Sequence, residues 1–151
     1  MFEAYLTNSM SCLIMAKQAL YSYRQTGIKN IKNSSAYNVQ QAAEYILKYL
    51  IYNNSGYNNG KNEENIKQIF THDIDLLAVR CESLDIAVPV EIKRNAALYT
   101  TWEAESRYDV GFSVRTDSLE KGINVVEKWL ISIKPLYKRK IQQVNKKLGL
   151  N

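Results

Sequence analysis

A column of polar side chains, spaced four residues apart, is the first place in this sequence where chemistry could occur. Gln40, Glu44 and Lys48 recur at i, i+4 intervals within the stretch 38–52, and that spacing places them on one face of an α-helix. Glu44 precedes Lys48, which is the favourable order for a helical ion pair worth about 0.2–0.5 kcal/mol. The column could form one wall of a ligand site, or it could be only a solvated face of the helix.

The single histidine of the chain, His72, lies in the sequence Thr71-His72-Asp73-Ile74-Asp75. A general base needs a positioned partner and a reacting group, and neighbours such as His72 and Asp73 do not face each other on a helix. Thr71 is a good helix N-cap, and aspartates in a first helical turn suit the helix dipole. A structural helix start is therefore the first interpretation, and ligand contact by His72 and Asp73 is the second.

A second group with binding chemistry lies near the end of the fourth predicted helix. Arg107 could bind a phosphate group in bidentate fashion, with Tyr108 or Trp102 as the surface on which a base stacks. Arg107 could equally pair with Glu44, or with a nearby glutamate of its own helix, and fix the following loop in place.

Other kinds of site lack the residues that they need. The sequence has no glycine-rich phosphate loop and no nucleophile elbow. One histidine and two distant cysteines, Cys12 and Cys81, are too few and too scattered for a zinc site. We therefore expect no metal, no cofactor and two reduced, buried thiols.

Helices must position these residues, because chain breakers are rare. Two prolines and six glycines in 151 residues favour long helices over a turn-rich β fold. Apolar residues recurring every three or four positions predict helices at 4–25, 36–53, 72–87, 89–104 and about 118–148. The polar segments 28–35 and 53–65 are predicted to be loops, and a short helical piece is expected at 64–70. The expected fold is all-α, an antiparallel up-and-down bundle of about five helices in a single domain over residues 1–151.

The long C-terminal helix contains Pro135 and carries the net charge. Its apolar stripe keeps its register from Leu119 to Leu148, which predicts a kinked but continuous helix, with two helices broken at Pro135 as the alternative. From Lys134 onwards there are six cations and no acid, against a net charge of +5 for the whole chain. This basic extension could project beyond the bundle, pack on a partner or meet phosphate groups, although a solvated polar face is the commoner reason for such charge.

Three of these pieces, taken in order, resemble the HEPN domain family of prokaryotes: Gln40-Gln41-Ala42-Ala43-Glu44 with Lys48, Thr71-His72-Asp73-Ile74, and Glu105-Ser106-Arg107-Tyr108. This chain has Ile74 where the family usually has leucine, and Asp109 where it usually has proline. The resemblance covers roughly residues 4–135. It implies an all-α bundle that forms a homodimer, binds a nucleotide or RNA, and has a nucleotidyltransferase as partner.

The resemblance also bears on catalysis. Some family members are metal-independent ribonucleases or toxins, in which an arginine is followed after a short spacing by a histidine. Here Arg94 is followed by Tyr99, and a tyrosine with a pKa of about 10 is a poor general base at neutral pH. A non-catalytic module is therefore expected. The alternatives are a degenerate ribonuclease toxin that keeps Arg94 and Tyr99 as remnants of its site, and a structural protein that pairs through the stripe from Leu119 to Leu148.

The chain start and the hydropathy predict where the protein acts. The N-terminal segment lacks the basic start and apolar core of a signal peptide. No apolar run approaches the length that a membrane-spanning helix needs. A cytoplasmic protein with no membrane contact is expected.

Overall fold

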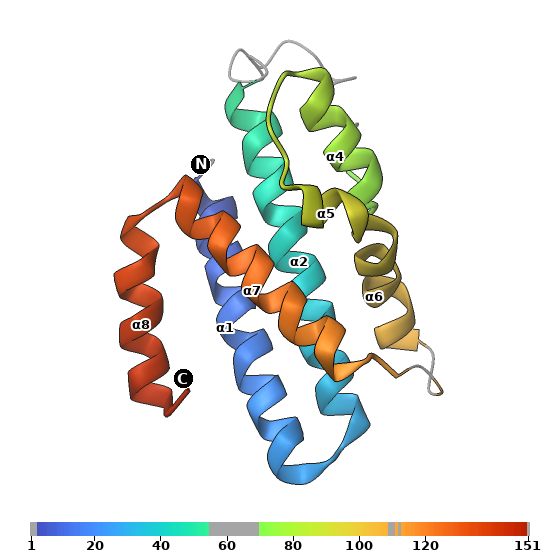
Figure 1. Cartoon of the computed structure of the whole chain (residues 1–151), viewed down its shortest axis with the longest axis vertical. Coiled ribbons are helices and arrows are strands. Elements are labelled where there is room, and N and C mark those ends of the chain that lie inside the picture. Colours follow the sequence, from blue (N-terminus) through green and yellow to red (C-terminus); the bar gives the residue numbers. More distant parts are fainter. Residues whose placement is uncertain (1–2, 55–69, 109–110, 112, 151) are drawn as a thin grey trace.

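The computed structural model describes residues 3–54, 70–108, 111 and 113–150, and every regular element among them is a helix (Figure 1). The helices are α1 (Glu3–Thr26), α2 (Lys29–Asn54), α4 (Ile74–Ser83), α5 (Val90–Arg94), α6 (Ala96–Tyr108), α7 (Thr116–Ile133) and α8 (Leu136–Leu148). The predicted all-α class is confirmed. The described helices outnumber the predicted five because two of the expected helices are each divided in two. The helical piece expected at 64–70 falls almost wholly outside the described residues.

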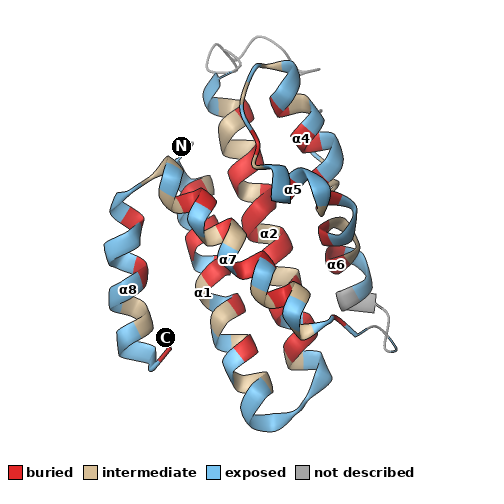
Figure 2. Ribbon diagram, viewed as in Figure 1, coloured by how far each residue is buried: buried red, intermediate tan, exposed pale blue. Residues whose placement is uncertain are grey.

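Helix α2 is the central element of the bundle. It packs against α1, α4, α6 and α7, and Figure 2 shows buried residues along much of its length. The largest fully buried side chains come from every described helix except α8, and include Leu13, Ile46, Leu77, Tyr99, Trp102 and Leu119. No residue from Ser35 to Tyr52 of α2 is exposed, so a polar group in this stretch lies in the core or close to it, where an unpaired hydrogen-bonding group is costly.

The loop predicted at 28–35 is wrong. Helix α1 ends at Thr26, Gly27 after it has a positive φ of 69° that favours glycine, and α2 already begins at Lys29. Polar residues in this segment are tolerated in a helix because they bond to the neighbouring helix. The Ser35 hydroxyl, for example, donates to the carbonyl of Ala16 at 2.7 Å.

The helix predicted at 89–104 is divided at Asn95. Its φ and ψ of −106° and 10° end α5, and its side-chain amide donates to the carbonyl of Glu91 at 2.8 Å. Asparagine competes with the helical backbone in this way, and α6 starts at the next residue. Pro89 precedes α5, where its fixed φ suits a helix start.

The prediction of a continuous last helix is also wrong, and the alternative of two helices is confirmed. Lys134 leaves the helical conformation, with φ −132° and ψ 86°, because a proline disfavours the helical conformation of the residue before it. Helix α8 then folds back along α1 instead of extending α7 (Figure 1). Tyr137 and Ile141 of the apolar stripe are buried against the bundle, so α8 does not project beyond it.

Both cysteines are free and buried, as the sequence predicts. Burial raises the pKa of the Cys81 thiol to about 12 and that of Cys12 to about 11, with the negative charge of Glu44 adding to the second effect. No helix among the described residues is long and apolar enough to cross a membrane.

Candidate functional site

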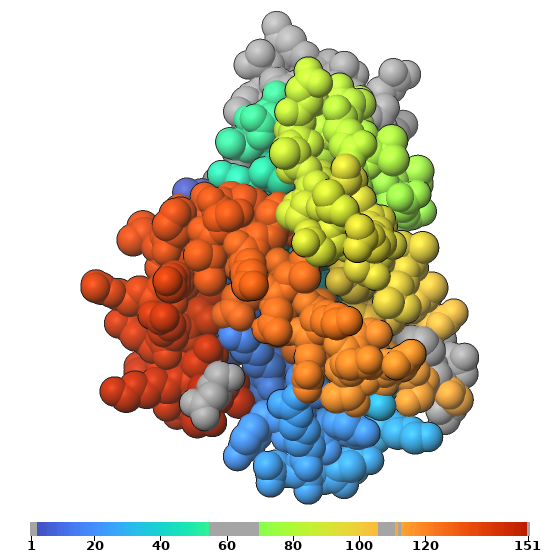
Figure 3. All heavy atoms as spheres, in the orientation of Figure 1, coloured from blue at the N-terminus to red at the C-terminus, as the bar shows by residue number. Residues whose placement is uncertain are grey.

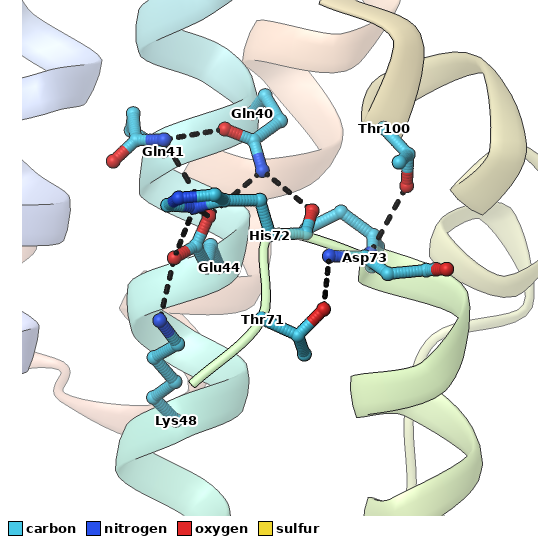
Figure 4. Close-up of polar contacts among 9 residues, drawn as sticks. Gln40, Gln41, Glu44, Lys48, Thr71, His72, Asp73 and Thr100 are labelled. Atoms are coloured by element: carbon cyan, nitrogen blue, oxygen red, sulfur yellow. Dashed lines mark hydrogen bonds and ion pairs between the residues drawn. The ribbon is translucent and has the colours of Figure 1, made fainter. Parts of the chain in front are cut away.

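The carboxylate of Glu44 lies at the centre of a cluster of hydrogen-bond donors (Figure 4). Only 3% of Glu44 is exposed. Its Oε1 accepts from the Lys48 ammonium group at 2.6 Å, and its Oε2 accepts from the side-chain amides of Gln40 at 2.9 Å and Gln41 at 3.4 Å. A buried carboxylate is tolerated when its oxygens are paired in this way. The column predicted from the sequence is therefore a buried network and not a solvated helix face.

His72 completes this cluster from the opposite side. Its Nδ1 lies 3.1 Å from Oε1 and 3.0 Å from Oε2 of Glu44. An ionised carboxylate can only accept hydrogen bonds, so Nδ1 must carry the proton in this contact. Among the residues that the structure describes, no hydrogen bond engages Nε2 at the other end of the ring, and the His72 side chain is 61% exposed. Glu44 thus fixes the orientation of a ring that solvent and ligands can reach.

The backbone that carries His72 is held from α2 and α6. The Gln40 amide donates to the His72 carbonyl at 3.1 Å, so that one glutamine contacts both Glu44 and the histidine segment. Two residues further on, the backbone N–H of Ile74 donates to the Thr100 hydroxyl of α6 at 3.0 Å. These two bonds place the start of α4 in register with both α2 and α6.

Asp73, and not Thr71, is the N-cap of α4. Its carboxylate accepts from the backbone N–H of Leu76 at 3.1 Å, and the Thr71 hydroxyl accepts from the N–H of Asp73, also at 3.1 Å. A helix does start in this segment, as predicted, but α4 begins at Ile74 and not at residue 72. Capping occupies one oxygen of Asp73, so this bond accounts for its place beside His72 without a ligand.

Trp102 lies in the core, where it cannot serve as the stacking surface that the sequence suggested. It is 1% exposed, its ring centroid is 4.9 Å from that of Tyr99, and the Cα of Gly122 approaches it closely enough that an added Cβ would lie 3.3 Å from the ring. A base needs an open aromatic face, and neither ring presents one.

The pair Arg94 and Tyr99 does not form a site in this structure. Arg94 is exposed at the end of α5, whereas Tyr99 is 2% exposed within the core. Burial raises the pKa of the Tyr99 hydroxyl further above its ordinary value, with a smaller contribution from the charge of Glu91. A buried tyrosine of this kind is even less suited to act as a general base.

Arg107 and Tyr108 lie in the last turn of α6, and their side chains lie outside the described part of the chain.

Two residues of the site were not predicted as site residues. In the sequence, Gln41 stood out only as part of the family motif. No pattern of neighbouring residues could have predicted Thr100, because its hydroxyl accepts a hydrogen bond from a residue 26 positions away. Within the described residues, no three His, Cys, Asp or Glu side chains are grouped as metal ligands would be.

These features define an all-helical bundle in which a glutamine, a glutamate and a lysine of one helix hold a histidine at the start of another. The chain belongs to the HEPN domain family: the HEPN domain model matches residues 10–134, which is most of the chain. Comparison with curated proteins and with solved structures found no match to this chain. Family membership makes it a nucleotide- or RNA-related helical module in the general sense.

Proposed function

We propose that this chain is a non-catalytic HEPN module that binds a nucleotide or RNA at the surface around His72. The observation that supports the proposal is the contact of Glu44 with Nδ1 of His72 at 3.0–3.1 Å. It holds the exposed ring in one orientation, and a pre-ordered ligand contact binds with less loss of side-chain entropy. The ring can stack on a base, and its Nε2 can bond to a phosphate or a base edge.

The neighbouring groups support binding more than catalysis. Lys48 is only 13% exposed on its side chain and is paired with Glu44, so its charge is already balanced. The residue that replaces the family's catalytic histidine, Tyr99, is buried in the core. His72 is thus the member of this cluster that is most open to a ligand.

We predict that His72→Ala weakens binding of nucleoside triphosphates or short RNA about tenfold or more, as measured by isothermal titration calorimetry. A tenfold change corresponds to about 1.4 kcal/mol, which is in the range of one hydrogen bond to a charged group. The free energy of unfolding should change by only about 1 kcal/mol or less, because the ring is mostly exposed. Lys93→Ala on α5, another partly exposed charged residue, is the matched control and should leave the binding constant unchanged. Absence of binding across the whole panel would reject the proposal, and equal affinity in His72→Ala would reject this site.

A ribonuclease is the second candidate function, and one observation favours it. An imidazole that is oriented through Nδ1 by a carboxylate presents Nε2 for proton transfer, as in catalytic triads. Metal-free cleavage of RNA by the wild-type chain, lost in His72→Ala, would establish this function over the first. Growth arrest on expression that disappears in Arg94→Ala would instead point to the toxin alternative with Arg94 in its site.

We further propose a homodimer, for which α4 offers an apolar surface. Phe70, Leu76 and Val79 are large apolar residues that are more than half exposed, and Leu76 and Val79 are three residues apart on one helix face. We predict that Leu76→Asp shifts the protein from dimer to monomer in size-exclusion chromatography with light scattering. Leu136→Asp, at the start of α8 and even more exposed, is the control and should stay dimeric. A wild-type monomer at high concentration would contradict the proposal.

The remaining expectations are proposals of the same kind. We propose that residues 1–151 form a single HEPN-like domain with a basic helical extension from about residue 134, that it acts in the cytoplasm, and that a nucleotidyltransferase is its partner. The resemblance supports the last of these. Co-expression with a nucleotidyltransferase encoded in the adjacent reading frame, followed by co-purification, tests that pairing directly.

A further inference from the structure

Helix α8 follows the part of the chain that matches the HEPN family model, and its apolar face is already covered. Tyr137 and Ile141 are buried, and the Tyr137 hydroxyl lies 3.2 Å from that of Thr7 in α1. Leu150, just after the helix, is also buried. A basic amphipathic helix can lie on a membrane when its apolar face is free, but here the bundle occupies most of that face.

The remaining surface of α8, around the sides of the helix that do not pack on the bundle, is open and strongly positive. Five cations on it are exposed: Lys138, Arg139, Lys140, Lys146 and Lys147. No ion pair engages them among the described residues, whereas Lys134, just before the helix, is paired with Glu3 at 2.7 Å. The whole chain has a net charge of +5, and six of its cations lie from Lys134 onwards with no acid, so the rest of the chain sums to −1. The positive field of this protein therefore originates on one helix.

A groove separates this basic face from the N-terminal turns of α1. It has a volume of about 420 Å³, and its lining includes Arg139, Lys140 and Gln143 of α8 together with the ion pair of Lys134 and Glu3. Arg139 and Lys140 are therefore the cations that this groove offers to a phosphate. Figure 3 shows α8 forming one flank of the molecule, where a long ligand could lie along it. Arginine and lysine side chains beside an amide are the groups that bind phosphate oxygens. Lys138 and Lys146 are eight residues apart on one face, or about 12 Å at 1.5 Å per residue, so their charges can meet separate phosphates.

Three tyrosine rings cluster where the N-terminal part of α1 packs on α2. The Tyr5 ring of α1 is 6.0 Å, centroid to centroid, from both Tyr45 and Tyr52 of α2, and all three side chains are partly exposed. Tyr45 directly follows Glu44, so these rings border the column that holds His72. Unpaired bases can stack on such rings, whereas bases in a duplex cannot reach them.

We infer that the exposed basic face of α8 binds the phosphate backbone of single-stranded RNA, independently of sequence, as a second contact surface apart from the site at His72. Helix α8 packs on α1 and α7, on the other side of the bundle from α4 (Figure 1). This inference rests on the proposed function in that RNA is the shared ligand. Most of the electrostatic contribution to RNA affinity then comes from α8, which follows the residues that match the family model, and His72 adds a local contact.

The test compares two triple variants that each lower the net charge from +5 by the same amount. One is Lys138→Gln, Arg139→Gln and Lys146→Gln on α8, and the other is Lys29→Gln, Lys121→Gln and Lys128→Gln at exposed positions elsewhere. Binding of a short fluorescent single-stranded RNA homopolymer is measured by anisotropy over a range of salt concentrations. Since each neutralised phosphate contributes about −0.7 to the slope of log K against log salt for single strands, the α8 variant should flatten the slope by about 2. We also expect an affinity at least about tenfold lower at low salt, and the control variant should match wild type.

The outcomes separate this inference from the proposed function. RNA binding that is lost in His72→Ala but equal in the two triple variants would overturn the role of α8 and leave the proposed site intact. RNA binding that depends on α8 but not on His72 would support α8 and reject the site. Equal affinity for a duplex of the same length would overturn the preference for single strands. The inference would also be overturned if wild type and the α8 variant bound equally to anionic vesicles while wild type did not bind RNA.

Discussion

Glu44→Ala is expected to lower the free energy of unfolding by about 3–5 kcal/mol, as measured by urea denaturation followed by circular dichroism. The substitution removes the acceptor for Lys48, Gln40, Gln41 and His72 at once. Gln40 is fully buried and Lys48 is nearly so, and removing one partner of a buried ion pair leaves an uncompensated charge. The loss should also free the start of α4, because His72 and its backbone are held through this cluster.

Glu120→Ala is the matched control for this change. Glu120 pairs with Arg24, but both side chains are about half exposed, and exposed ion pairs contribute about 0–1 kcal/mol. The control should therefore stay within about 1 kcal/mol of wild type. If Glu44→Ala costs no more than Glu120→Ala, the network does not stabilise the fold, and its role must be sought in ligand binding alone.

Trp102→Ala should destabilise the protein by a similar amount, about 3–5 kcal/mol, because it removes a large, fully buried side chain from the core. The cavity would open beside Gly122 of α7, where an added Cβ would lie 3.3 Å from both the Trp102 ring of α6 and the Val39 side chain of α2. The same denaturation experiment measures the loss. A cost below about 1 kcal/mol would contradict the packing described for this ring.

Trp102→Phe distinguishes a core residue from a ligand contact. The smaller ring keeps much of the packing, so the protein should remain folded with a smaller loss of stability. Because Trp102 has no open face, the affinity for nucleoside triphosphates or RNA should equal that of wild type. A selective loss of affinity in this folded variant would restore the stacking role that the sequence alone suggested.

The periodicity of apolar residues was enough to predict the class of fold and the main helices, because helix formation and amphipathic burial depend on residues three and four positions apart. The order of the motifs was enough to predict the family. The same local pattern failed at Pro135 and Asn95. Both residues preserve the register of apolar residues while changing the direction or continuity of the backbone.

The sequence by itself determined that Glu44 and Lys48 share a helix face and that His72 lies at a helix start. Only the tertiary structure decided that these two places meet, with Glu44 and His72 in contact across 28 positions of the chain. It also decided that Trp102 and Tyr99 belong to the core and that α8 turns back along α1. The physical reason is the same in each case. A residue's spacing fixes which face of its own helix it occupies, but the packing of other helices decides whether that face meets a partner, the core or water.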